Sequence, residues 1–292
     1  MSLKTLYLTP GYFDKGGISR YCRYQIQALR EIHGPVQVRA LSLMGPDPTG
    51  FEESFETAWH GPTPSPTMGS RVLSTFRALR EVLIWRPDVI HGAHVNFTPL
   101  LYWLARLCKA TTVLNVYGLE IWSGLSFTRR EYLSPMNRVI SDCHATADHL
   151  VNEGLHLQQP TVIWDCADLE RFHSGPFSCS LLDRYGLPDP NHHRILLTLG
   201  RLSVTARHKG YDRLLDVFAQ VRVRVPTAHL VIAGRGDDAE RLKAKANSLG
   251  LNEWVTFTGP IDEEDLPDLY RAAHVFALVS DKGPDRGEGV SP

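Results

Sequence analysis

The chain has 292 residues, of which 43% are hydrophobic and 22% charged, and it carries a formal net charge of -1 with a pI near 6.9. A length of this order favours two domains over one. A net charge so close to zero provides no overall field that would recruit nucleic acid, so any binding site for an anion must be local.

The first half of the sequence alternates short, β-rich apolar runs with longer segments patterned like helices. This alternation is typical of βαβ units around a parallel sheet. A helix is expected to begin near Ile18, and the proline-rich stretch from Gly45 to Gly69 is expected to form a long exposed loop. The predicted strands cover residues 5–9, 36–43, 88–92, 111–117, 138–145 and 161–164.

The same alternation resumes in the second half, after a break at residues 174–193 that is rich in Pro, Gly, Ser and His. A helix is predicted after Lys209, with an apolar face at helical spacing. That face consists of Leu214, Leu215, Phe218 and Val221. The predicted strands of this half cover residues 194–200, 228–234, 254–259 and 273–280.

The break is interpreted as a linker, with a hinge within residues 165–195, between two domains that span residues 1–173 and 194–292. The predicted fold class is therefore α/β, with two Rossmann-like, doubly wound domains. Sheets of this kind bind ligands at the carboxyl ends of their strands, so a ligand is expected in a cleft between Gly17 and Arg201.

Glycines follow the first predicted strand in the stretch TPGYFDKGGISRY. Gly16 and Gly17 directly precede the predicted helix. Small residues at this point let a ligand approach the backbone, and a helix N-terminus favours negative charge. A plain tight turn is an equal alternative for an isolated pair of glycines.

Cations follow the first strand of the second domain in the stretch GRLSVTARHKGYDRLL. Arg201 offers a planar fork and Lys209 a point charge, so that the two residues can meet one polyanion from two sides. Arg207 lies in the same loop. On charge alone, a solvated basic loop is the alternative.

Several other site types lack their sequence motifs. The stretch AGRGDD has Gly234 and Gly236 after a strand but no third glycine, which disfavours a nicotinamide cofactor, and no G-x-x-x-x-G-K-[ST] motif is present. No two aspartates stand two positions apart, so the D-x-D pair that holds a divalent metal in many sugar-nucleotide enzymes is absent. His91 and His94 are expected to be structural because no third metal ligand is evident.

The order of these motifs carries a resemblance. The glycine pair after the first strand is followed by GRL, with KG downstream, then by IAGRG, VTFTGPI and a final EGVSP. In this order they resemble the retaining glycosyltransferases of family 4, which have the GT-B fold and include mannosyl- and glucosyltransferases and sucrose synthase. The likeness extends over nearly the whole chain and is strongest from Arg194 onward.

The resemblance implies a donor site for a nucleoside-diphosphate sugar, with no metal and no other cofactor. Arg201 and Lys209 would neutralise the leaving diphosphate, and Gly17 would let the first loop approach the donor phosphates or the acceptor. Glu288 matches the first Glu of the family's E-x7-E motif and would meet the hydroxyls of the transferred sugar. The remaining donor-site residues implied are Gly16, Gly234, Pro260, Ile261, Gly289 and Val290. The implied reaction is a front-face displacement with retention, in which the leaving phosphate helps to deprotonate the acceptor.

Two positions depart from the family pattern. Tyr117 stands where the family often has a histidine, followed by Gly and an acidic residue that Glu120 matches. A tyrosine can still form hydrogen bonds but cannot carry the positive charge, so Tyr117 is either a catalytic residue or a packed aromatic. The second Glu of the motif would fall at position 296, beyond Pro292, so the second domain is expected to be incomplete.

Three functions remain open at this stage. The leading one is a retaining, metal-independent glycosyltransferase with an unidentified acceptor. The others are a sugar-nucleotide epimerase with a GT-B-like fold and a non-catalytic protein that binds sugar nucleotides.

The expected location is cytoplasmic. Five scattered cysteines without a C-x-x-C pair suit reduced thiols, and the longest apolar stretch, which begins at Pro99, is far shorter than the roughly 20 residues of a membrane span. The N-terminus has no signal-peptide pattern. Peripheral contact with the inner membrane face stays open, because many family members act on lipid-linked acceptors, although no pronounced basic amphipathic helix stands out.

Overall fold

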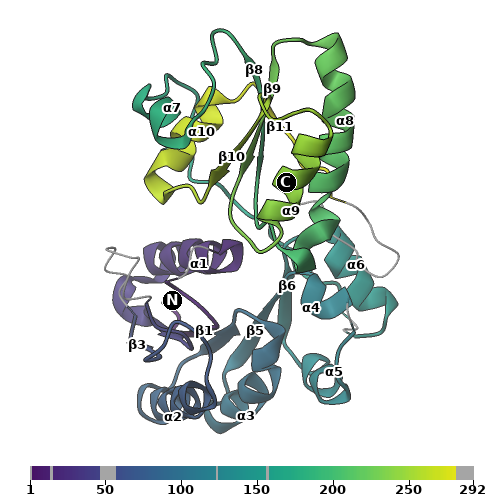
Figure 1. Cartoon of the computed structure of the whole chain (residues 1–292). Coiled ribbons are helices and arrows are strands. Elements are labelled where there is room, and N and C mark those ends of the chain that lie inside the picture. Colours follow the sequence, from purple (N-terminus) through teal and green to yellow (C-terminus); the bar gives the residue numbers. More distant parts are fainter. Residues whose placement is uncertain (1, 14–15, 47–56, 123, 156–157, 281–292) are drawn as a thin grey trace. The chain divides into compact units, whose positions relative to one another are not determined.

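The computed structural model describes residues 2–13, 16–46, 57–122, 124–155 and 158–280 (Figure 1). These residues divide into two compact units, with the boundary between Cys166 and Ala167. Within the described part of the chain, no helix is both long and apolar enough to cross a membrane.

The first unit is built on one parallel sheet with the strand order β3-β2-β1-β4-β5-β6-β7. Leu6 of β1 pairs with Arg39 of β2 on one side and with Ile90 of β4 on the other. The strand order therefore reverses between β1 and β4, which is where doubly wound sheets open a ligand site. The strands are β1 (Thr5–Thr9), β2 (Val38–Ser42), β3 (Trp59–His60), β4 (Val89–Gly92), β5 (Thr111–Val116), β6 (Arg138–Ser141) and β7 (Thr161–Val162).

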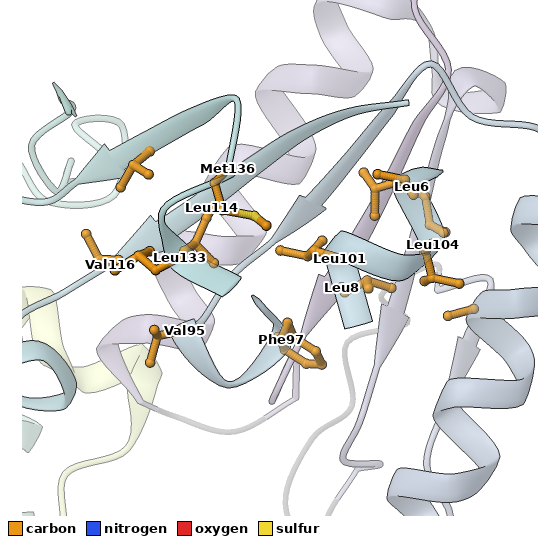
Figure 2. Close-up of a cluster of buried hydrophobic side chains, with 14 of the residues drawn as sticks. Leu6, Leu8, Val95, Phe97, Leu101, Leu104, Leu114, Val116, Leu133 and Met136 are labelled. Carbon is orange, nitrogen blue, oxygen red and sulfur yellow. The ribbon is translucent and has the colours of Figure 1, made fainter. Parts of the chain in front are cut away.

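Both faces of this sheet are covered, because side chains alternate along a strand. Leu6 and Leu8 point into a core shared with α2 and α3, whereas Tyr7 points into a second core with α1. Figure 2 shows Leu6, Leu8 and Leu101 in the first of these cores. The helices are α1 (Gly17–His33), α2 (Met68–Trp85), α3 (Thr98–Cys108), α4 (Leu119–Trp122), α5 (Phe127–Leu133) and α6 (His144–Asn152), with 3-10 turns at Pro35–Gln37 and Val95–Phe97.

The second unit has a smaller parallel sheet with the order β10-β9-β8-β11, which reverses between β8 and β11. The strands are β8 (Arg194–Leu199), β9 (Ala228–Ala233), β10 (Val255–Gly259) and β11 (Val275–Phe276). The helices are α7 (Ser180–Tyr185), α8 (Tyr211–Arg224), α9 (Ala239–Ser248) and α10 (Leu266–Ala272), with 3-10 turns at Val204–Lys209 and Glu263–Asp265. Leu214, Leu215 and Phe218 of α8 are buried against β9, as their helical spacing predicts.

Two parts of the chain differ from the sequence interpretation. The expected loop from Gly45 to Gly69 contains β3, where Trp59 pairs with Leu41 and packs on the core of the first unit. A strand of two residues is too short to show periodicity, so its partner strand decides that it forms. Residues 174–193 contain α7 and belong to the second unit, because Leu181 and Leu187 pack beneath its sheet.

Candidate functional site

The carboxyl ends of β8, β9 and β10 are tied together by backbone hydrogen bonds. Gly200 N–H donates to Ala233 at 3.0 Å, Leu202 N–H to Arg235 at 3.0 Å, and Gly234 N–H to Gly259 at 2.8 Å. The three loops therefore form one continuous edge of the second sheet.

Two glycines make this close approach possible. A Cβ atom at Gly234 would lie within 3.0 Å of the carbonyl oxygen of Gly200, and one at Gly236 equally close to that of Leu202. Gly234 also has a φ of +132°, which L side chains rarely adopt. The packing of the two loops thus accounts for both glycines without a ligand.

Arg201 and Arg235 are exposed on this edge, and Lys209 is half-buried at the end of the 3-10 turn before α8. None of these three cations makes an ion pair or a side-chain hydrogen bond with any residue that the structure describes. An uncompensated cluster of cations at the carboxyl end of a parallel sheet is suited to binding a polyanion.

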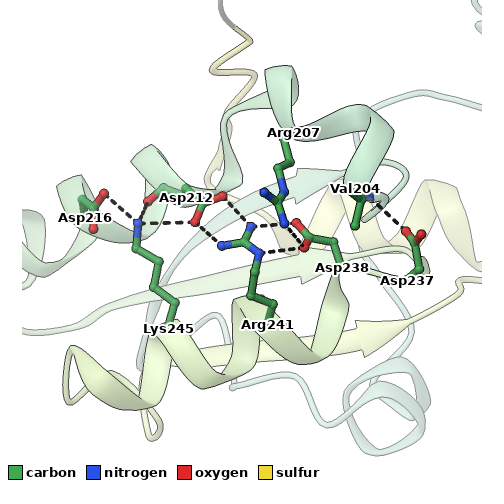
Figure 3. Close-up of polar contacts among 8 residues, drawn as sticks. All are labelled: Val204, Arg207, Asp212, Asp216, Asp237, Asp238, Arg241 and Lys245. Carbon is green, nitrogen blue, oxygen red and sulfur yellow. Dashed lines mark hydrogen bonds and ion pairs between the residues drawn. The ribbon is translucent and has the colours of Figure 1, made fainter.

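The neighbouring cations are neutralised inside the second unit (Figure 3). Arg207 lies 3.3 Å from the Asp238 carboxylate, and Arg241 bridges Asp212 and Asp238 at 2.6 and 2.7 Å. The Arg241 hydrogen bonds hold the pKa of both carboxyl groups below their ordinary value, with further help from Arg207 at Asp238. Arg207 is therefore a structural cation, which distinguishes it from Arg201 and Lys209.

Pro260 and Ile261 directly follow β10, as expected from the TGPID segment. Pro260 is exposed, whereas Ile261 is half-buried against the core that contains Leu269. Glu288, Gly289 and Val290 lie outside the described residues.

In the first unit, Gly16 caps α1 and Gly17 is its first residue, at the carboxyl end of β1. Gly17 is exposed, its φ is not positive, and a Cβ atom there would meet no atom of the described residues within 4 Å. Among the residues that the structure describes, neither the backbone conformation nor the packing requires a glycine at position 17.

Tyr117 directly follows β5, and its side chain is held inside the first unit. Its hydroxyl accepts a hydrogen bond from Asn115 Nδ2 at 3.2 Å and lies 3.8 Å from Cys22 Sγ. The Tyr21 and Tyr117 rings meet in a T-shaped arrangement, and the Tyr117 backbone N–H donates to Glu120 Oε1 at 2.7 Å. Burial raises the pKa of Tyr117 well above its usual value, so the hydroxyl stays protonated. These contacts fit the packed aromatic, one of the two interpretations that the sequence allows.

The two histidines of HGAH have structural partners. Asn115 Nδ2 donates to Gln25 at 2.6 Å, so Asn115 Oδ1 accepts from His91 Nε2 at 2.9 Å. His94 Nδ1 accepts from the backbone N–H of Asn96 at 3.1 Å, which caps a 3-10 turn. Among the described residues, no group of three or more His, Cys, Asp or Glu side chains is placed to hold a metal ion.

Three functional candidates escaped the sequence analysis. Arg235 lies within the stretch AGRGDD, in which only the glycines were interpreted. Asp142 and Asp165 each begin an Asp-Cys pair after a strand, in ISDC and IWDC. That repeated pair was the available signal.

Asp142 is a carboxyl group with a perturbed environment at the end of β6. Its Oδ1 atom is buried without a hydrogen-bond partner among the described residues. Burial, together with the nearby charges of Asp165 and Glu120, raises the pKa of Asp142 to about 6, and burial also raises the pKa of Asp165. Carboxyl groups whose pKa is raised at a strand end are candidates for binding or proton transfer.

Two family models match the sequence. The model described as Glycosyltransferase Family 4 matches residues 15–171, and the model described as Glycosyl transferases group 1 matches residues 184–291. The two matches fall on the two halves of the chain that carry the two sheets.

Named relatives support the same assignment. The chain is 37% identical over 287 residues to a GDP-mannose-dependent alpha-(1-6)-phosphatidylinositol monomannoside mannosyltransferase of Mycolicibacterium smegmatis, covering 90% of this chain and 69% of that protein. It is 43% identical over 95 residues to the mannosylfructose-phosphate synthase of Agrobacterium fabrum, covering 30% of this chain and 20% of that protein. The chain thus spans about two thirds of the first of these relatives and a fifth of the second.

Among solved structures, the chain resembles Anabaena Alr3699/HepE in complex with UDP and glucose, with a TM-score of 0.73 and 16% identity over 97% of this chain and 75% of that one. At this identity the likeness shows the fold alone. Because a family model matches more than half of the sequence and the Mycolicibacterium relative aligns over most of both proteins, the chain belongs to the glycosyltransferases of family 4, which have the GT-B fold.

Proposed function

We propose that the protein transfers a sugar, with retention of configuration and without a metal, from a nucleoside-diphosphate sugar to an acceptor. The second unit binds the donor at the edge formed after β8, β9 and β10. The acceptor binds at the carboxyl edge of the first sheet, where Gly17, Asp142 and Asp165 lie.

The observation that carries this proposal is the contrast between paired and unpaired cations in the second unit. Arg207 has a carboxylate partner, whereas Arg201, Lys209 and Arg235 have none among the described residues. A diphosphate supplies the missing negative charge. The sequence predicts Arg201 and Lys209 for this role, and we propose Arg235 as a third cation because it is exposed at the same sheet edge.

The chemistry follows from charge. As the sugar leaves, negative charge grows on the diphosphate, and cations that already stand in place stabilise that charge without reorganising. This is the part that a divalent metal plays in other transferases. On the front face of the sugar, the departing phosphate accepts the proton of the acceptor hydroxyl.

GDP-mannose is the first donor to test, because the Mycolicibacterium relative is named as dependent on it. Binding to the folded chain would raise the melting midpoint by mass action, with a stabilisation of about 2.7 kcal/mol at a hundredfold excess over Kd. A thermal-shift comparison with UDP- and ADP-sugars identifies the base. Turnover with an acceptor then separates a transferase from a protein that only binds donor, and formation of an epimer without an acceptor would indicate the epimerase.

The site itself is tested by calorimetry with GDP on single variants. Each charge-assisted contact contributes about 1.5 to 3 kcal/mol, so Arg201→Ala and Lys209→Ala should weaken binding by roughly tenfold to a hundredfold. Arg207→Ala is the matched control from the same loop. It should change affinity by no more than about 0.5 kcal/mol, because its charge is used within the unit.

The pattern of losses decides the interpretation. Equal losses in all three variants would mean that the loop is a diffuse basic patch. No loss in Arg201→Ala and Lys209→Ala would place the diphosphate elsewhere.

A further inference from the structure

The side chain of Asp237 is exposed in the loop after β9, near residues that carry positive charge. Arg235 precedes it by two positions, and a backbone hydrogen bond joins Arg235 to the loop that carries Arg201. A carboxylate repels a bound diphosphate, so on charge alone Asp237 disfavours the donor that this edge is proposed to bind. Its contacts indicate a different role.

The Asp237 carboxylate caps a turn that belongs to the neighbouring loop. Its Oδ1 atom accepts a hydrogen bond from the backbone N–H of Val204 at 2.9 Å, which Figure 3 shows as a dashed line. Val204 is the first residue of the 3-10 turn Val204–Lys209, and the first N–H groups of such a turn have no partner inside it. The Ser203 side chain accepts the next N–H, that of Thr205, at 3.3 Å. Asp237 thus satisfies an amide that the turn itself cannot satisfy.

This turn connects the two cations that we propose for the diphosphate. Arg201 lies three residues before Val204, and Lys209 is the last residue of the turn. The interior of the turn is irregular, because Ala206 has non-helical angles of φ -108° and ψ 20°. The hydrogen bonds inside a 3-10 turn are also poorer in geometry than those of an α-helix. The separation of Arg201 and Lys209 therefore depends on contacts from outside the turn.

The contacts between the two loops differ in how directly they hold the turn. The backbone hydrogen bonds act at Leu202, which donates to Arg235 at 3.0 Å and accepts from Asp238 at 2.8 Å. Arg207 contacts Asp238 through a long side chain that is 53% exposed, and ion pairs of such side chains contribute little. The Asp237 hydrogen bond, in contrast, is made to the backbone of the turn itself. It therefore restrains the start of the turn directly.

We propose that Asp237 is a positioning residue for donor binding, because by capping the turn it holds Arg201 and Lys209 at the separation that a diphosphate requires. Cations that are already in place bind the donor without the cost of ordering the loop. The inference rests on the proposed function, since it assumes that these two cations bind the diphosphate. It assigns a role in anion binding to a residue that is itself negatively charged.

Two substitutions separate the hydrogen bond of Asp237 from its charge. Asp237→Ala removes both, whereas Asp237→Asn removes the charge and keeps an oxygen that can accept the Val204 N–H. The measurement is calorimetry with GDP, UDP or ADP, whichever binds the wild type most tightly.

The expected changes in affinity differ between the two variants. Asp237→Ala should bind the nucleotide roughly threefold to tenfold more weakly, since loss of the cap loosens the turn. Asp237→Asn should bind it as tightly as the wild type, or up to about threefold more tightly, because the repelling charge is gone. Charge alone would predict tighter binding in both variants.

Glu240 provides a matched control for the loss of a nearby carboxylate. It follows Asp237 by three residues, its side chain is 85% exposed, and it pairs with Lys243 within α9. Glu240→Ala therefore removes a neighbouring negative charge and leaves the cap intact. Its affinity for the nucleotide should stay within about twofold of the wild-type value.

A double-mutant cycle tests whether Asp237 acts through the turn. Asp237→Ala should cost less affinity in a Lys209→Ala background than in the wild type, because the positioned charge is already missing. In the absence of nucleotide, hydrogen exchange within residues 201–210 should be faster in Asp237→Ala and like that of the wild type in Asp237→Asn. The melting midpoint of both variants should stay close to that of the wild type, since Asp237 is exposed.

Three results would overturn the inference and leave the proposed donor site in place. Wild-type or tighter binding by Asp237→Ala would show that the cap does not matter. Equal weakening in both variants would assign the effect to the charge, and an undiminished loss in the Lys209→Ala background would assign it to a general loss of structure. Failure of the proposed function is distinguishable, because Arg201→Ala and Lys209→Ala would then bind like the wild type, or the wild type would bind none of the three nucleotides.

Discussion

Four glycines allow backbone strain and steric overlap to be measured separately. With respect to the residues that the structure describes, Gly17 has neither, and Gly250 has a φ of +70° with no neighbouring atom within 4 Å. A Cβ atom at Gly236 would overlap Leu202 although its φ is not positive, and Gly234 combines a φ of +132° with overlap onto Gly200. Among the four alanine variants, one introduces neither effect, one introduces only backbone strain, one introduces only steric overlap, and one introduces both.

The expected changes in unfolding free energy follow from these two terms. Gly17→Ala should be neutral or stabilising by up to about 1 kcal/mol, since alanine lowers the entropy of the unfolded chain. Gly250→Ala should cost about 1–2 kcal/mol for the left-handed conformation alone.

The overlapping positions should cost more. Gly236→Ala should cost about 2–5 kcal/mol, because the loops must separate and the Leu202–Arg235 and Asp238–Leu202 backbone hydrogen bonds weaken. Gly234→Ala adds its φ strain to a similar overlap and should cost about 3–6 kcal/mol.

The assay is urea unfolding followed by circular dichroism, with hydrogen exchange of β8 and β9 peptides to locate the change in the second unit. If Gly236→Ala proves as stable as Gly17→Ala, the loops after β8 and β9 do not pack as described. Gly17→Ala also tests function: a stable variant with impaired turnover would show that the open space at position 17 serves a ligand.

Two further outcomes are expected in the first unit. Burial lowers the pKa of His91 to about 4, so the folded state binds the proton more weakly than the unfolded state. The unfolding free energy should therefore fall by roughly 3 kcal/mol as the pH drops from 6.5 to 4. This loss should largely disappear in His91→Gln, and an unchanged pH profile of that variant in urea titrations would exclude His91 as its source. Tyr117→Phe removes the hydroxyl that Asn115 contacts, which should cost about 1 kcal/mol in unfolding free energy and leave turnover nearly intact. A large loss of turnover at unchanged donor affinity would instead assign Tyr117 a catalytic role.

Local patterns in the sequence determined most of the architecture. Apolar runs of strand length between helical periodicities predicted ten strands, and each corresponds to a strand of the two parallel sheets. The helix starting near Ile18 was expected directly after the glycine pair, and the buried face of α8 followed from helical spacing. These features depend on residues close together in the chain, which is why one sequence suffices to predict them.

The candidate site could be predicted from sequence only as residue types at strand ends. The loop after β8 offers Arg201, Arg207 and Lys209 as similar cations, and the sequence ranks them only through a family resemblance. The structure separates them because Asp238, 31 residues beyond Arg207, takes up that charge. A partner so distant in the chain leaves no periodic signal.

Burial is likewise decided by tertiary packing. Residues of similar hydrophobicity on α2 are either in the core or exposed, depending on which side of the helix faces the sheet. Trp59 becomes part of β3 because Leu41 is beside it, and Leu181 joins the second unit because its sheet lies against α7. The sequence thus determined the elements and the kinds of chemistry, whereas only the fold decided which charges are left unpaired and which apolar faces stay uncovered, since both depend on neighbours that the chain brings together from afar.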